Sequence, residues 1–231
     1  MTYNLSGEKS KILVISYYLF RRTEVYFTEM SKSSTLIKPD TRDLIIKEAT
    51  HLFYIHGVHW VSFQQIAERV HISQPAIYKH FKDKDDLLVA CTLSAAEAGR
   101  AVIDNHVMQQ STILKRLYSY LEGNLIWLEK DRPQASMLLA MYYFSHINPP
   151  LKNVLLAIHK QSVNRVKTHL DEGKNQKKWD IKDTEIFART IHNLLIGEML
   201  KLFHQPEEYN LDDRMKILKS SFSLLLKASP S

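Results

Sequence analysis

The sequence has 231 residues, of which 45% are hydrophobic and 24% charged, so it can bury a sizeable apolar core and does not have a disordered composition. A formal net charge of +6 suits a nucleic-acid partner without requiring one, because many proteins carry such a charge for solubility. The single cysteine, Cys91, excludes an internal disulfide and a cysteine-based metal site. Its apolar helical surroundings favour a buried side chain, and a reducing cytoplasm is the expected location.

The N-terminal segment, residues 1–38, differs in composition from the rest of the chain. A short apolar run at 12–20, flanked by lysine and arginine, resembles the core of a signal peptide, but no small-residue cleavage site follows it. The run is also too short to span a membrane as a helix, and we expect no membrane partner; a surface anchor is the alternative. We predict that residues 1–38 are an extension that is disordered, or that translation begins at Met30 and residues 1–29 do not belong to the protein.

Residues 39–86 are predicted to form a first domain of three short helices. The first of these stops at Gly57, because glycine accepts the left-handed conformation that ends many helices. Ser62 caps the second helix and Ser73 the third, since serine side chains accept hydrogen bonds from the first free backbone N–H groups of a helix. The tight turn at 71–73 separates the second helix from the third.

Residues 87–231 are predicted to form a larger helical domain. Asp83 caps a long fourth helix that runs to about Asn105, and the chain continues in helices to its end, the last two over 184–204 and 211–227. The segment 137–144 is apolar on nearly every side, which is typical of a central helix. One stripe is expected to be buried in the helix before it: Leu114, Leu117, Leu121, Leu125 and Leu128. The expected class is all-α, with about nine helices.

Residues 42–84 have the spacing of a helix-turn-helix unit, in which a short helix, a three-residue turn and a second short helix follow one another. Between Arg69 and Asp83 the chain has no acidic residue, whereas Lys79 and Lys82 fall in the same interval. Such a face suits a major groove, whose phosphates attract cations and whose base edges bind amide and ammonium groups. The alternative is an ordinary three-helix unit with a solvated polar face.

A set of motifs in the same region has a specific combination of spacings. The motifs are Leu52-Phe53, Gly57, Ser62, Ile66-Ala67, Ile72-Ser73, Ile77-Tyr78-Lys79-His80-Phe81, Lys84 and Leu87-Leu88. Together they resemble the signature of the TetR/AcrR family of bacterial transcriptional regulators. The resemblance covers about a fifth of the chain and implies a homodimer that binds a near-palindromic operator, usually as a repressor, and is released by a small molecule. His71 stands where the family usually has glycine, and a left-handed conformation there would cost histidine roughly 1 kcal/mol.

The resemblance implies DNA contacts from three parts of the first domain. The second helix would touch phosphates at its start, the third helix would present its groove-facing positions and two backbone contacts, and the fourth helix would add one phosphate contact. The phosphate contacts of the second helix would come from Ser62 and Gln64. The groove-facing positions of the third helix are Ser73, Gln74, Pro75, Ala76 and Lys79, and its two backbone contacts are Tyr78 and His80. The phosphate contact of the fourth helix is Lys84. Packing on the first helix is the alternative for Tyr78, and simple surface exposure is the alternative for His80 and Lys84.

The resemblance also implies an effector site and a dimer interface in the second domain. An apolar or amphipathic organic effector would suit the aromatic, methionine and histidine candidates Trp127, Met137, Met141, Tyr142, Phe144, His146, His159 and Met199. The family dimerises through its last two helices, which here implies Phe187, Leu194, Leu195, Met215, Leu218, Phe222 and Leu225. For both sets the alternative is packing in the core of one chain.

Signals of other functions are absent from the sequence. It contains no nucleophile elbow, no zinc-binding His-Glu-x-x-His and no phosphate-binding loop, so we expect no enzyme activity, no cofactor and no metal. Double-stranded DNA, a second copy of the chain and a small organic molecule are the expected partners. Two alternatives stay open: a helical ligand-binding or interaction protein without DNA binding, and a transcriptional activator of the same fold.

Overall fold

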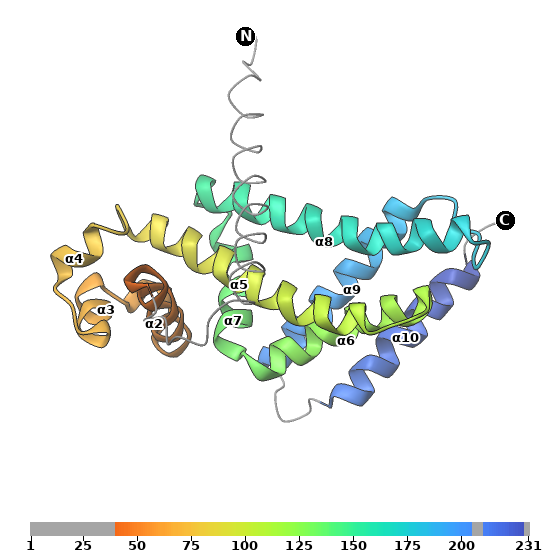
Figure 1. The fold of residues 1–231 in the computed structure, drawn as a ribbon, viewed down its shortest axis with the longest axis horizontal. Helices are drawn as coiled ribbons and strands as arrows, with labels where there is room; N and C mark the ends of the chain where they lie inside the picture. The colour runs from red at the N-terminus through yellow and green to blue at the C-terminus, as the bar shows by residue number, and fades with distance from the viewer. Residues whose placement is uncertain (1–39, 205–209, 229–231) are drawn as a thin grey trace, which may run out of the picture. The chain divides into compact units, whose positions relative to one another are not determined.

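A computed structural model of the chain describes residues 40–204 and 210–228. The predictions for residues 1–38, with the start at Met30, lie outside the described residues. All regular structure within the described residues is helical, which confirms the all-α class (Figure 1). The N-terminal elements are α2 (Thr41–His56), the 3₁₀ turn η1 (Val58–Trp60), α3 (Phe63–Val70), α4 (Gln74–Tyr78) and α5 (Lys84–Met108).

The ends of the first helices follow from their caps. Gly57, with φ of 81°, lies just beyond the end of α2, and its N–H donates to the Phe53 carbonyl at 2.9 Å. Ser62 begins α3 with a reciprocal capping box: its Oγ accepts from the Gln65 N–H at 3.3 Å, and Gln65 Oε1 accepts from the Ser62 N–H at 2.8 Å. His71 ends α3 in the left-handed conformation, with φ of 60°, so the chain makes this turn without glycine.

The C-terminal elements are α6 (Ile113–Lys130), α7 (Arg132–Phe144), α8 (Pro149–Asn175), α9 (Thr184–His204) and α10 (Leu211–Ala228). α5 packs along α6 and α7, and α8 packs along α9 (Figure 1). The approach of α5 to α6 is close at Gly123, where an added Cβ would lie 3.0 Å from the Ile103 Cα. α5 and α8 each run a few residues past their predicted ends near Asn105 and Gly173.

Two apolar clusters form the core of the described chain. One joins α2–α4 and the first half of α5 to buried side chains of α7 and α8, and the other joins α6, α8, α9 and α10. α5 contributes to both, with Leu87 in the first cluster and Ile103 in the second. Residues from Leu44 onward form one unit, and the predicted domain boundary at 86/87 falls inside α5, so it stays a prediction.

Three details of burial bear on the sequence-based predictions. Cys91 is buried as expected. Leu114 is 40% exposed, so its place in the α6 stripe was wrong, because Ile113 occupies the buried position four residues before Leu117. Tyr143 is 80% exposed, so α7 is not buried on every side. None of the helices in the described ranges is long and apolar enough to cross a membrane.

Candidate nucleic-acid interface

The short helix α4 is held by apolar side chains that it buries against α3. Ile77 of α4 and Phe81, three residues after its end, are fully buried, and Ile66 and Ala67 of α3 lie in the same cluster. The small side chain of Ala67 allows the two helices to cross closely. This packing fixes the angle between α3 and α4, so the opposite side of α4 has a defined position on the surface.

The accessible side of α4 carries the groove-facing candidates that the sequence predicted. Lys79 is exposed, as are Ser73 and Pro75 before it, and two neighbours are half-buried, Gln74 and Ala76. Ser73 stands at the N-cap, yet its side chain makes no capping hydrogen bond, which leaves the hydroxyl available to an outside partner. The structure therefore brings these five candidates together along one short helix, from Ser73 at its N-cap to Lys79 at its C-cap.

Tyr78 combines packing with exposure. Its ring meets the ring of Phe63 edge-on, with centroids 5.1 Å apart, while 54% of the residue stays exposed. The alternative prediction for Tyr78 was packing on the first helix of the unit, α2. Phe63 is the first residue of α3, so this aromatic contact is with the second helix instead. The contact holds the phenol at the rim of the interface.

The side chains of Ser62 and Gln64 make hydrogen bonds within α3. Ser62 takes part in the capping box, and Gln64 Nε2 donates to Glu68 Oε1 at 2.7 Å. The backbone N–H groups in the first turn of a helix have no partner inside it, and they carry the positive end of the helix dipole. Any anion at this end of α3 would therefore meet these backbone groups as well as the two predicted side chains.

Lys84, predicted to contact a phosphate, is engaged inside the protein. Its Nζ donates to the Val61 carbonyl at 2.7 Å and to the His59 carbonyl at 3.4 Å, and it lies 5.9 Å from the centre of the Phe53 ring. Partial burial lowers the pKa of this ammonium group below its ordinary value. Lys84 thus ties the η1 turn to the start of α5.

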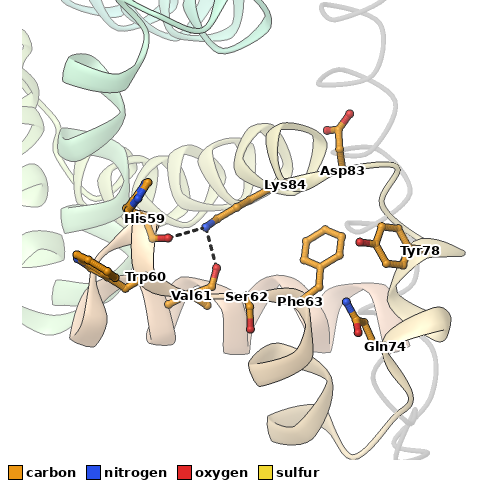
Figure 2. A pocket seen from close by; sticks show the side chains of 9 residues that line it. All are labelled: His59, Trp60, Val61, Ser62, Phe63, Gln74, Tyr78, Asp83 and Lys84. Carbon is orange, nitrogen blue, oxygen red and sulfur yellow. Dashed lines mark hydrogen bonds between the residues drawn. The ribbon is translucent and has the colours of Figure 1, made fainter.

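A groove of about 440 Å³ lies beside α3 and α4. Figure 2 shows the residues that line it: His59, Trp60, Val61, Ser62, Phe63, Gln74, Tyr78, Asp83 and Lys84. Four of these were predicted from the sequence, whereas His59 and Trp60 were not. A signal for them was available in the sequence: His59 and Trp60 are adjacent aromatic residues in the short segment between two predicted helices, and they do not continue the apolar spacing of either helix.

The effector candidates are brought together only in part. Trp127 and Met199 belong to the second apolar cluster, and Met137 and Met141 belong to the first, where Tyr142 and Phe144 pack against it. His146 is exposed in the turn after α7. His159 of α8 meets His192 of α9 edge-on, with ring centroids 4.8 Å apart. In the described ranges no three potential metal ligands gather in one place.

Most of the dimer candidates pack within one chain. Five are buried in the second cluster: Phe187, Leu195, Met215, Leu218 and Phe222. The Phe222 ring contacts the rings of Tyr118 and Phe187, with centroids 5.8 and 5.6 Å apart. Leu225 is half-buried and Leu194 is exposed. For the five buried side chains, the intramolecular alternative describes what the structure shows.

Comparisons with known proteins agree with this arrangement. Residues 45–91 match the model of the family described as bacterial regulatory proteins, tetR family. This range begins inside α2, includes α3 and α4, and reaches into α5. No curated protein matches the sequence.

Solved structures extend the likeness to most of the chain. The fatty acid degradation regulator FadR from Bacillus halodurans is 20% identical, with a TM-score of 0.68 over 82% of this chain and 96% of that one. A transcriptional regulator from Saccharomonospora viridis, in complex with choline, is 18% identical, with a TM-score of 0.72 over 79% of this chain and 95% of that one. PfmR from Thermus thermophilus, a TetR-family regulator, is 19% identical, with a TM-score of 0.60 over 81% of this chain and 99% of that one. The protein has the fold of the TetR-family transcriptional regulators, and its residues 45–91 match the model of that family.

Proposed function

We propose that the protein is a sequence-specific DNA-binding repressor that acts in the cytoplasm as a homodimer and is released by a small organic effector. The observation that carries the proposal is the accessible face of α4. Gln74 lies in α4, between Ser73 at its N-cap and Lys79 at its C-cap. The buried side chains of Ile77, in the helix, and Phe81, three residues after its end, hold α4 against the core. A rigid helix with amide, hydroxyl and ammonium groups on its open side is suited to the major groove.

The charge around α4 supports the proposal. Lys79 and Lys82 are exposed, and the chain has no acidic residue from His71 to Lys82. The nearest carboxylate that follows, Asp83, accepts a hydrogen bond from the Asp86 N–H at 2.9 Å as the cap of α5. A phosphate backbone would therefore meet cations and helix N-termini on this side of the domain.

Replacing Lys79 by alanine is expected to weaken operator binding about tenfold or more, because each subunit of a dimer loses a cation close to the DNA. The dependence of log K on log salt should become shallower by about 2 for the dimer. Fluorescence anisotropy with labelled duplex from upstream of the gene, measured over a salt series, gives both quantities. Tyr78→Ala should weaken binding as well and leave the salt dependence nearly unchanged, since the phenol is neutral.

Lys115→Ala provides the matched control, since Lys115 is an exposed lysine of α6. It removes the same charge far along the chain from α4 and is expected to bind as the unmodified protein does. Equal losses in Lys79→Ala and Lys115→Ala would show that net charge alone drives binding. Binding unaffected by Lys79→Ala and Tyr78→Ala would remove α4 from the interface.

The dimer is proposed to form through the outer sides of α9 and α10. On α9 the exposed apolar residues Ile186, Leu194 and Leu200 fall on one side of the helix. Gly197 lies between them, and a Cβ built on it meets nothing within 4 Å in the single chain. On α10, Ile217 and Leu224 are exposed and seven residues apart, so they also share a side. A two-fold dimer of this kind would place two α4 helices about 34–36 Å apart, as a near-palindromic operator requires.

The double substitution Leu194→Glu/Leu224→Glu is expected to convert the dimer to a monomer, because it would bury four carboxylates in the interface. Both leucines are exposed in the single chain, so the helical content should persist. Sedimentation velocity measures the mass, and circular dichroism measures the fold. Leu114→Glu on α6, also exposed, is the control and should stay dimeric. A double variant that sediments as the parent protein does would exclude these sides of α9 and α10.

The effector is proposed to act through α5. This helix belongs to both apolar clusters, and the α7 residues Met137 and Met141 share a cluster with Ile77 of α4. A small organic molecule that favours a different packing of α7 or α8 could therefore change the position of α4, to the extent that it binds the two states unequally. A regulator of similar fold is in complex with choline, which supports a small organic effector here as well.

A further inference from the structure

Trp60 is a large apolar side chain that belongs to neither apolar cluster of the described residues. It lies in η1 and is 76% exposed, although tryptophan is highly buried on average in folded proteins. Its neighbour Val61 is 2% exposed and anchors the segment in the first apolar cluster. The burial of Val61 fixes the chain at this point, so the indole of Trp60 is not needed to hold the turn in place.

The backbone that carries Trp60 is fixed on both sides. The Trp60 N–H donates to the Gly57 carbonyl at 3.3 Å, and Gly57 adopts φ of 81°. The Lys84 ammonium binds the carbonyls of His59 and Val61, the residues before and after Trp60. The His59 ring meets the indole edge-on, with centroids 5.4 Å apart. The side chain is therefore presented from a rigid turn, which lowers the entropy lost when a partner binds it.

The groove connects Trp60 to the proposed DNA-reading helix. In Figure 2, Trp60 lies at one end of the row of lining side chains, and Gln74 and Tyr78 lie at the other. Ser62, at the N-cap of α3, lies between them. Among the described residues that line the groove, the only carboxylate is that of Asp83, and it is engaged as the cap of α5. The groove is thus continuous with the α4 face and carries little negative charge toward a phosphate chain.

We infer that Trp60 is a contact to the sugar–phosphate backbone of double-stranded DNA, outside the helix-turn-helix itself. This inference rests on the proposed function. If α4 lies in the major groove, the strand that passes the start of α3 continues along the groove toward η1. The indole offers an apolar face for the deoxyribose and an N–H that can donate to a phosphate oxygen.

The chemistry of the indole predicts how this contact behaves. Sugar and phosphate are the same at every base pair, so Trp60 adds affinity for any duplex and does not select a sequence. The indole is neutral and releases no counterions, so its contribution does not change the salt dependence of binding. These two properties separate a Trp60 contact from the contacts proposed for Lys79 and Gln74.

The test compares Trp60→Ala and Trp60→Phe with the unmodified full chain on an upstream duplex and on an unrelated duplex, over a salt series. Trp60→Ala should raise the Kd for both duplexes about tenfold with an unchanged salt slope, and Trp60→Phe should lie between. Tyr143→Ala, which removes another exposed aromatic side chain, is the control and should bind normally. Addition of DNA should also change tryptophan emission in the unmodified protein and not in Trp60→Phe.

The outcomes separate this inference from the proposed function. Loss of binding in Tyr78→Ala together with full binding in Trp60→Ala and Trp60→Phe would overturn the role of Trp60 alone. Absence of DNA binding by the unmodified protein would overturn both. Because Trp60 is mostly exposed, Trp60→Ala should melt at the same temperature as the unmodified protein. If Trp60→Ala is destabilised, the binding of Trp60→Phe still tests the inference.

Discussion

Glu198→Ala is expected to lower the free energy of unfolding by about 3–5 kcal/mol, because it leaves a buried guanidinium group without its partner. Glu198 Oε2 accepts from Arg214 at 3.2 Å, and the side chains of these residues are only 9% and 12% exposed. The pair joins α9 to α10. Lys201, which bonds the other carboxylate oxygen at 3.0 Å, is half-exposed and can turn to water, whereas Arg214 cannot.

A double variant separates the ion pair from the space that it fills. Glu198→Met/Arg214→Met removes both charges and keeps apolar volume, so its stability should lie near that of the parent. Urea denaturation at equal protein concentrations measures the unfolding free energy of the parent, the single variant and the double variant, since the stability of the proposed dimer would depend on concentration. Lys201→Ala should cost less than about 1 kcal/mol, as expected of a half-exposed partner. A loss below about 1 kcal/mol in Glu198→Ala would mean that water enters and solvates Arg214.

The helices and their first turns could be predicted because their signals are local. Gly57, Ser62 and Asp83 each end or begin a helix through groups within four residues of themselves, and the structure shows the caps at all three. Helix ends without such a cap were predicted less well. α5 and α8 run past Asn105 and Gly173 because neither residue is a cap and the packing of the neighbouring helices carries the helix further.

The spacing of apolar residues along a helix did not predict whether its apolar face packs within the chain or against a second chain. The intervals of three and four residues between Met215, Leu218 and Phe222 are the same whether the partner is a second chain or the rest of this one. In the structure the three side chains pack within one chain, with Phe222 between rings of α6 and α9. Exposed residues such as Leu224, off the regular seam, are left for the proposed dimer contact.

In the candidate interface, the accessibility of α4 could be predicted from the sequence, but the contacts that Lys84 makes within the chain could not. Ser73 and Lys79 are accessible on α4, as the motif implied. Lys84 is instead bound to carbonyls of a segment about 25 positions earlier in the chain, and no local pattern reports such a contact. Trp60 depends on the same contact, since the turn that presents it is the one that Lys84 holds.

Acid is expected to destabilise the protein through His192, which is 4% exposed and has no hydrogen-bond partner at either ring nitrogen among residues 40–204 and 210–228. Burial first, and the neighbouring His159 second, lower its pKa from 6.5 to about 4. The folded state therefore holds His192 neutral at pH values where the unfolded chain already binds a proton. The stability that depends on this difference is fully present above pH 6.5 and is lost as the pH falls toward 4, by about 3 kcal/mol in total.

His192→Leu isolates this contribution, because leucine fills the site without titrating. The difference in unfolding free energy between parent and variant should grow by about 3 kcal/mol in favour of the variant between about pH 7 and pH 4, whatever other groups do in both proteins. His159→Gln should keep most of the pH dependence, since burial rather than the neighbouring ring is the larger cause of the lowered pKa. Equal pH dependence in the parent and in His192→Leu would show that water or protons reach this ring in the folded state. In that case the contact of His159 with His192 would be part of an open site between α8 and α9 and not of a dry core.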